Sequence, residues 1–172
     1  MKKQLILAAA LLPLFGPLGA WAQTDLSKAH LDGSGLGAIR IGQRLDRLPV
    51  PLQQPIERTA YGNSGACFYV FAEKRSDFGM MIEDDRLTRI DVDKPGIKTD
   101  KGISVGDPVA RIRAAYGPAA VEGRDFYDDR MPEFTVKSAD GSQAVRFSTD
   151  GHRVTAIIAG RAASVAYVEG CL

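Results

Sequence analysis

A weak internal repeat is the feature that most restricts how this chain of 172 residues folds. Residues 37–48 (GAIRIGQRLDRL) align with residues 101–112 (KGISVGDPVARI). Two later matches, 67–70 with 133–136 and 87–90 with 154–157, keep the same order at similar offsets. Three matches in register indicate duplication of one supersecondary unit, with loops of different length in the two copies.

Each unit is expected to open with a short helix. In the second unit, Asp107 is a residue type that caps helices and Pro108 suits the first helical position, while Val109, Ile112 and Tyr116 follow at helical spacing. In the first unit, two prolines arrive directly after the aligned segment, so that its helix is expected to last barely two turns.

After each helix the apolar pattern changes to a period of two, as in Phe134 and Val136, which is typical of strands with one buried face. Asp-Gly pairs at 140–141 and 150–151 mark hairpin turns, and Asp84-Asp85 plays the same part in the first unit. The strands are expected near residues 67–70, 78–82, 87–92, 134–136, 145–147 and 154–157, with a last strand at 164–169.

The predicted fold class is α+β, with two repeats of a short helix plus a three-stranded antiparallel sheet joined into one continuous sheet. The expected organisation is a signal peptide (1–22), a flexible N-terminal segment (23–35), a first repeat (36–93), a connector (94–101) and a second repeat with a C-terminal strand (102–172).

The N-terminus has the pattern of a secretory signal peptide. Lys2 and Lys3 precede an apolar stretch, and Ala20-Trp21-Ala22 provides small residues around a cleavage site. The alternative, a transmembrane anchor, is disfavoured because two prolines and a glycine interrupt a short stretch. The sequence therefore predicts a periplasmic or secreted protein with no transmembrane segment after cleavage.

The chain contains two cysteines, Cys67 and Cys171. In an oxidising compartment one disulfide between them is expected, and two free, buried thiols are the alternative. A catalytic role is disfavoured, since neither belongs to a C-x-x-C pair that lowers a thiol pKa.

The recurring motif at residues 39–42 (IRIG) and 103–106 (ISVG), each followed by a short helix and hairpins, resembles the helix-plus-three-strand module of outer-membrane assembly lipoproteins of the SmpA/OmlA type. The tandem arrangement is similar to the β-lactamase inhibitory proteins. This resemblance covers residues 36–160 and implies protein binding through a sheet face. The chain departs from it in lacking an N-terminal cysteine for acylation and in having one bridge that links the two units, and no functional residue of the family maps onto it.

The charge is nearly balanced, with 22 Lys and Arg against 21 Asp and Glu and a net charge of +1. Such a balance gives no long-range attraction for polyanions, so nucleic acids and acidic membrane surfaces are not expected partners.

Catalytic groups are scarce in this sequence. The only histidines are His30, in a poorly patterned segment, and His152, in a tight turn where a solvated side chain is the simpler interpretation. We therefore expect no catalytic residues and no enzymatic activity.

Metal and cofactor motifs are also missing. The acidic groups lack the alternating order of a calcium loop, the histidines and cysteines lack zinc spacing, and the glycines at 33–37 lack the lysine of a phosphate-binding loop. No cofactor or metal is expected. The acidic residues concerned are Asp84, Asp85, Asp125, Asp128 and Asp129.

Alternation within the strands predicts a binding surface. If Phe68 and Val70 face the core, Tyr69 and Phe71 point to the opposite face. The alternative is that these aromatics pack under the N-terminal segment or the loop 119–131. Because Tyr, Arg and Met are enriched in protein interfaces, the candidate surface comprises Tyr69, Phe71, Met81, Arg89, Arg146 and Tyr167.

The function predicted from these features is an exported, non-enzymatic module that binds an unidentified protein, with inhibition of a periplasmic or extracellular protein as one form of it. One alternative is an envelope assembly or stress factor with the same fold. The other is a small hydrolase or ligand-binding protein, which requires a pocket that contains His152 or the carboxylates of 125–129.

Overall fold

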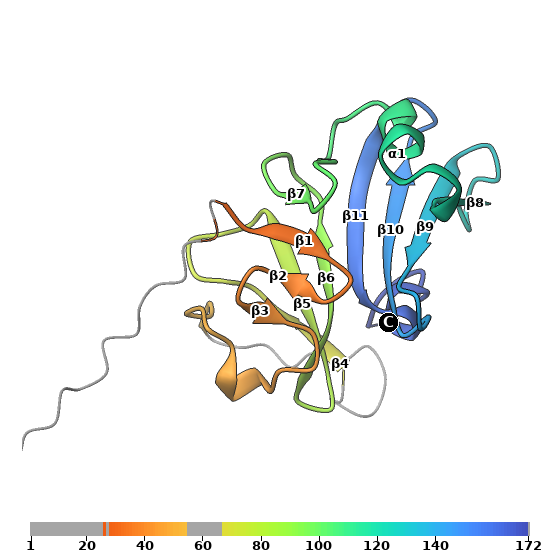
Figure 1. Cartoon of the computed structure of the whole chain (residues 1–172). Coiled ribbons are helices and arrows are strands. Elements are labelled where there is room, and N and C mark those ends of the chain that lie inside the picture. Colours follow the sequence, from red (N-terminus) through yellow and green to blue (C-terminus); the bar gives the residue numbers. More distant parts are fainter. Residues whose placement is uncertain (1–25, 27, 55–66, 172) are drawn as a thin grey trace, which may run out of the picture.

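The structure is a computed structural model that describes residues 26, 28–54 and 67–171. The predicted signal peptide lies outside these residues. The described chain is mostly β and forms two sheets, with short helices at their margins (Figure 1).

The first sheet, which we call the large sheet, has seven strands, and every neighbouring pair is antiparallel. The antiparallel pairing expected from the sequence is thus confirmed. In spatial order the strands are β4 (Cys67–Val70), β5 (Phe78–Glu83), β6 (Arg86–Val92), β11 (Val154–Arg161), β10 (Gln143–Thr149), β9 (Pro132–Lys137) and β8 (Val121–Arg124).

The second sheet, which we call the small sheet, has four short strands and lies across one face of the large sheet (Figure 1). Three of its strands form a meander, and the fourth adds in parallel to β1. They are, in spatial order, β3 (Ile39–Arg40), β2 (Gly35–Leu36), β1 (His30–Asp32) and β7 (Lys98–Thr99).

The predicted fold class, two repeats of a short helix plus three strands in one continuous sheet, is wrong. The described chain has a separate small sheet, and the large sheet has seven strands, of which the second half supplies four. In the first half, the expected helix is a single 3₁₀ turn, η1 (Leu45–Arg47). Strands of two or three residues are too short to show a periodic pattern, so the small sheet could not be predicted from the sequence.

The described residues of the expected flexible segment at 23–35 include strand β1 and the first residue of β2. Leu31 of β1, Leu36 of β2 and Ile39 of β3 are fully buried and belong to the same apolar core as the large sheet. We call the face of the large sheet that contributes to this core the inner face and the opposite face the outer face. The largest buried side chains of the large sheet are Phe68, Phe78, Phe134 and Phe147.

Helix α1 (Val109–Tyr116) lies where the sequence predicted it, with Val109 and Ile112 buried. It begins one residue later than expected, because Pro108 is its N-cap and Asp107 does not cap it. Instead, Asp107 accepts a hydrogen bond from the Ser104 amide at 2.8 Å and pairs with Arg111 at 2.8 Å. A further 3₁₀ turn, η2 (Gly117–Ala119), ends the helical segment.

The predicted disulfide between Cys67 and Cys171 is present, with a Cα–Cα distance of 5.4 Å. The predicted last strand at 164–169 is wrong, because the chain forms the short helix α2 (Ala162–Val165) and then turns. Residues 162–171, which we call the C-terminal segment, reach edge strand β4 by crossing the outer face, so they do not extend the sheet.

Candidate functional site

The register of the large sheet brings the predicted surface residues together on the outer face. Tyr69 on β4 lies opposite Met81 on β5, which lies opposite Arg89 on β6. In the next row, Asp91 of β6 lies opposite Ile158, which lies opposite Arg146 of β10. A single pleated face therefore holds both rows.

Two of the predicted contact residues are nevertheless buried. Met81 has no exposed surface and Arg89 is 4% exposed, so neither is available to a partner protein. The physical reason is the C-terminal segment, which covers this half of the outer face. Tyr69 is half-buried, whereas Phe71 and Tyr167 are 41% and 43% exposed.

Arg89 is the centre of a polar network beneath the C-terminal segment. Its guanidinium pairs with the Asp91 carboxylate, at 2.6 Å from Nε to Oδ1 and 3.1 Å from Nη2 to Oδ2. Its Nη1 donates to the backbone carbonyls of Ser164 at 3.1 Å and Tyr167 at 2.9 Å. One side chain thus satisfies a partly buried carboxylate and fixes the path of the chain end.

Tyr69 extends this network. Its hydroxyl donates to Asp91 Oδ2 at 2.6 Å. Burial, followed by the negative charge of Asp91 and the hydrogen bond to it, raises the pKa of Tyr69 well above its usual value of 10.0. Gly170 lies directly on the ring, since a Cβ there would be 2.5 Å from the Tyr69 hydroxyl oxygen. Tyr69 therefore remains a neutral donor at any physiological pH.

Next to this network the outer face is hollowed. The hollow, which we call the outer hollow, has a volume of about 460 Å³ and is lined by Tyr69, Phe71, Gly79, Arg89, Asp91, Asp93 and neighbouring apolar residues of β5, β6 and β11. Gly79 gives the rings room, since a Cβ there would be 3.2 Å from Phe71 and 3.3 Å from Tyr69. The result is an aromatic wall beside two carboxylates.

Arg146 lies farther along the outer face and is less well paired. Its Nε is 4.0 Å from Glu133 Oε1, beyond hydrogen-bond distance, and within the described residues this buried nitrogen has no hydrogen-bond partner. Its Nη2 donates weakly to the Tyr167 carbonyl at 3.4 Å. Glu133 instead accepts from the Ser148 hydroxyl at 2.9 Å.

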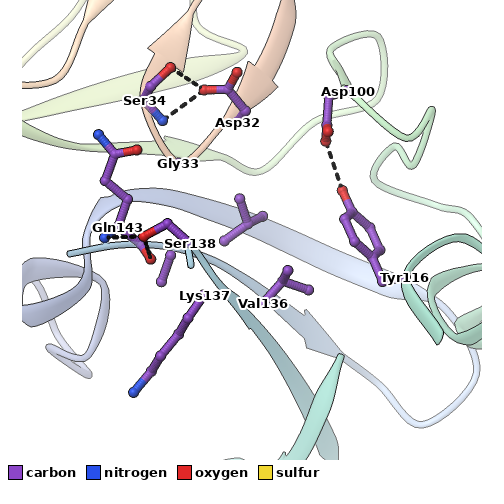
Figure 2. Close-up of a pocket in the computed structure, with 11 residues that line it drawn as sticks. Asp32, Gly33, Ser34, Asp100, Tyr116, Val136, Lys137, Ser138 and Gln143 are labelled. Carbon is purple, nitrogen blue, oxygen red and sulfur yellow. Dashed lines mark hydrogen bonds between the residues drawn. The ribbon is translucent and has the colours of Figure 1, made fainter. Parts of the chain in front are cut away.

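A second hollow, which we call the inner cleft, lies between the β1–β2 turn, α1 and the β9–β10 hairpin (Figure 2). Its volume is about 330 Å³, and Val136 and Val145 supply an apolar surface. The Tyr116 hydroxyl donates to Asp100 Oδ1 at 3.1 Å across one end. Burial raises the pKa of Tyr116, so this group is also a neutral donor.

Polar groups also line the other end of the inner cleft. Asp32 Oδ1 accepts hydrogen bonds from the backbone amide and the hydroxyl of Ser34. The backbone amide of Gln143 donates to the Ser138 hydroxyl (Figure 2). Lys137 belongs to the lining as well. Most of these polar groups satisfy one another within the protein.

The two histidines lie apart from both hollows. His30 is exposed on β1, and His152 is exposed in the β10–β11 turn. There, Asp150 Oδ1 accepts from the amides of His152 and Arg153, and these backbone bonds lower the pKa of Asp150.

The acidic residues of the loop after β8 are engaged in turns. Asp125 Oδ1 accepts from the Tyr127 and Asp128 amides. The hydrogen bond from the Arg130 guanidinium lowers the pKa of Asp128 to about 2. No three His, Cys, Asp or Glu side chains of the described residues are placed to hold a metal ion.

Two residues of the outer hollow were not among the predicted surface residues, although alternation along the strand places them on the same face. Asp91 is two residues from Arg89 in the same strand, and Asp93 is two residues further on. The i, i+2 spacing of Arg89 and Asp91 predicts that the two side chains share a face. The covering role of the C-terminal segment left no comparable pattern in the sequence.

Comparisons with known proteins identify a fold but no family. No protein-family model matches the chain, and no curated protein matches it. Among solved structures, it is similar to the crystal structure of the uncharacterized protein YfeY from Escherichia coli. The two share 18% sequence identity and a TM-score of 0.50 over 77% of this chain and 99% of that chain. This likeness extends to the chain path alone, so the two proteins share a fold.

Proposed function

We propose that this protein is an exported binding protein that receives a basic side chain of a partner protein in the outer hollow. The observation that carries the proposal is the aromatic wall of Tyr69 and Phe71 beside Asp91 and Asp93, on a face already ordered by the Arg89 network. Because those polar groups are preorganised, little ordering is required when a partner binds.

Export is supported by two features of the chain. The Cys67–Cys171 disulfide is compatible with an oxidising compartment, and the N-terminal sequence has the pattern of a signal peptide. Within residues 26, 28–54 and 67–171, no helix is long and apolar enough to cross a membrane. The proposed location is the periplasm or the extracellular space.

The chemistry of the hollow favours a lysine or arginine side chain. Among the residues that line it, Asp91 and Asp93 are negative and Arg89 is positive, so the lining itself carries one excess negative charge. Lys94 lies outside the lining and donates to the hydroxyl of the lining residue Ser76 at 3.1 Å. The rings of Tyr69 and Phe71 offer a surface for the aliphatic stem or the cationic head of such a side chain. Phe71 is exposed enough to make this contact without rearrangement.

The test is site-specific photocrosslinking in intact cells of the source organism. A benzoylphenylalanine replaces Phe71 in one variant and Asp140, at the exposed tip of the β9–β10 hairpin, in a control. We expect position 71 to yield a crosslinked protein that position 140 does not. The identity of that protein distinguishes an inhibited target from a component of envelope assembly.

A charge reversal makes the test specific. Asp93→Lys introduced beside the photocrosslinker is expected to reduce the adduct about tenfold, because it places a like charge against the basic side chain. Asp140→Lys, with the same change in net charge, is expected to leave it unchanged. No adduct at position 71, or an adduct that is indifferent to Asp93→Lys, contradicts the proposal.

The inner cleft favours a second candidate function, the binding of a small polar molecule. Its support is the juxtaposition of Asp32, Asp100 and the Tyr116 hydroxyl with an apolar surface in a space of about 330 Å³. Native mass spectrometry of the protein purified from its own host is expected to show a mass that denaturation releases. A spectrum of the bare polypeptide alone counts against this candidate.

A further inference from the structure

The edge strand β8 has an unusual arrangement of charge and exposure. Within the described part of the chain it pairs only with β9, and all four of its residues are exposed. Its sequence is Val121, Glu122, Gly123 and Arg124. Exposed edge strands are commonly protected by charged side chains, which repel a second strand, or by proline, which has no backbone N–H to donate, whereas here two opposite charges flank a glycine.

The pairing of β8 with β9 determines which residues of β8 direct their backbone N–H and C=O groups toward β9 and which direct them away from it. We call this order the hydrogen-bond phase of β8. The Asp125 amide donates to the Met131 carbonyl at 2.9 Å, one pair beyond Arg124 and Pro132. In an antiparallel ladder such bonded pairs alternate with unbonded ones. The amides and carbonyls of Glu122 and Arg124 therefore point away from β9, toward the free edge.

From this placement we infer that β8 is the site of self-association, in which two copies of the chain join their large sheets across a twofold axis at Gly123. In this register Glu122 lies opposite Arg124 of the partner subunit, and the converse pair is identical by symmetry. Both positions have outward-pointing backbone groups, so the same register satisfies the backbone hydrogen bonds.

Other registers are unfavourable. An axis at Glu122 places two carboxylates directly opposite each other, and an axis at Arg124 does the same with two guanidiniums. If the axis lies between two residues, a residue whose N–H and C=O point outward faces one whose groups point inward. The backbone hydrogen bonds between the two copies then cannot form. The charge order and the hydrogen-bond phase thus select one register.

The present partners of the two charged groups do not prevent this pairing. Glu122 Oε2 accepts from Arg113 Nη2 at 2.6 Å, and Arg124 Nη1 donates to the Asp129 carbonyl at 3.3 Å. A carboxylate accepts, and a guanidinium donates, more than one hydrogen bond. Both side chains are on the exposed strand and keep this further capacity.

Exposed apolar groups lie beside the proposed junction. Val121 is 67% exposed, and the loop after β8 presents Phe126, 74% exposed, in an edge-to-face contact with Tyr127 at 5.1 Å between ring centroids. In the proposed register, this loop of one copy runs alongside the start of β8 in the other. Burial of these groups adds an apolar contribution to the backbone and charge pairing.

The test is sedimentation velocity of the oxidised protein over a wide concentration range at low ionic strength. We expect a reversible monomer–dimer equilibrium for the wild type. Glu122→Arg and Arg124→Glu are each expected to weaken dimerisation about tenfold or more, because each creates two like-charge contacts per dimer. Arg161→Glu, at the end of internal strand β11, is the matched control and is expected to leave dimerisation unchanged.

Mixing provides the decisive measurement. Equal amounts of the Glu122→Arg and Arg124→Glu proteins are expected to form a heterodimer, because every pair across the axis is then of opposite charge. Thermal melting of each variant verifies that it is folded. A wild type that stays monomeric at all concentrations, a dimer insensitive to both single variants, or a mixture without heterodimer overturns the inference. None of these results bears on the outer hollow, which is tested separately by crosslinking at Phe71.

Discussion

The guanidinium of Arg89 on β6 donates a hydrogen bond of 2.9 Å to the backbone carbonyl of Tyr167, 78 positions later in the chain. This bond holds the C-terminal segment on the outer face of the large sheet. The disulfide from Cys171 to Cys67 secures the same segment at its far end. Together they determine which residues of the predicted surface remain accessible.

Loss of the disulfide is expected to destabilise the protein strongly. The bridge spans a sequence separation of 104 residues, and closing a loop of this length contributes about 4–5 kcal/mol in the chain-entropy model. Cys171→Ser is expected to lower the free energy of unfolding in urea by an amount of this order relative to the oxidised wild type. Fully reduced wild type and Cys171→Ser are expected to unfold at the same urea concentration. Equal stability of oxidised and reduced wild type contradicts this prediction.

The ion pair between the buried Arg89 and the part-buried Asp91 is expected to matter more than a similar pair whose arginine is less buried. Arg89→Gln removes the partner of a partly buried carboxylate and of two backbone carbonyls, at a cost of about 3 kcal/mol. The Arg89 side chain is 5% exposed.

Arg75 and Asp77 are the matched control, because they have the same spacing along the chain but the Arg75 side chain is 33% exposed. Arg75→Gln is expected to cost less than about 1 kcal/mol. Urea denaturation of both variants measures the difference. Equal losses would show that burial of Arg89 has no energetic consequence.

Stability is expected to fall in alkaline solution because of Tyr69. Burial and the Asp91 charge raise the pKa of Tyr69 in the folded protein above the usual 10.0. The unfolded chain therefore releases this proton first as the pH rises above 10, and the free energy of unfolding decreases from there toward the folded pKa. Below this window the contribution is fully present.

Tyr69→Phe removes the titrating group from both states. Stability as a function of pH, measured by urea unfolding from neutral to strongly alkaline solution, is expected to decline less steeply in this variant than in the wild type. At neutral pH the variant is expected to be less stable, since Asp91 loses a hydrogen-bond donor. An identical alkaline slope for the two proteins argues against the raised pKa.

Gly160 is expected to tolerate no side chain. Its φ is +151°, and an added Cβ would lie 2.2 Å from the Thr88 carbonyl oxygen on the neighbouring strand β6. Gly160→Ala is therefore expected to cost about 2–4 kcal/mol through backbone strain and displacement of β6. Gly123→Ala, where a Cβ meets open space, is the control. Thermal melting at low protein concentration compares the two, and comparable melting temperatures would contradict the clash.

Local sequence patterns predicted much of the large sheet. Alternation around Phe134 and Val136 correctly predicted strand β9. The predicted turn between β5 and β6 lies at Asp84 and Asp85, which both have positive φ. Helical spacing gave α1 to within one residue at its start. These features are local because the backbone period and the turn residues are properties of short segments.

Such local patterns do not predict the small sheet or the covering of the outer face by the C-terminal segment. Strands β2 and β3 have two residues each, which is too few for a period, and their burial depends on contact with strands far away in the chain. Met81 alternates like an outward-facing residue, yet it is fully buried. Whether an outward side chain meets solvent depends on what else packs on that face.

The amino-acid sequence by itself determined the covalent bridge between Cys67 and Cys171, the positions of most strands of the large sheet, and the sharing of one face by Tyr69, Arg89 and their neighbours. Only the tertiary structure decided which of those side chains are exposed, because the path of residues 162–171 depends on long-range bonds to Arg89 and β4. The same holds for the edge at β8, which among the described residues pairs only with β9 because of where the sheet ends and not because of its own sequence.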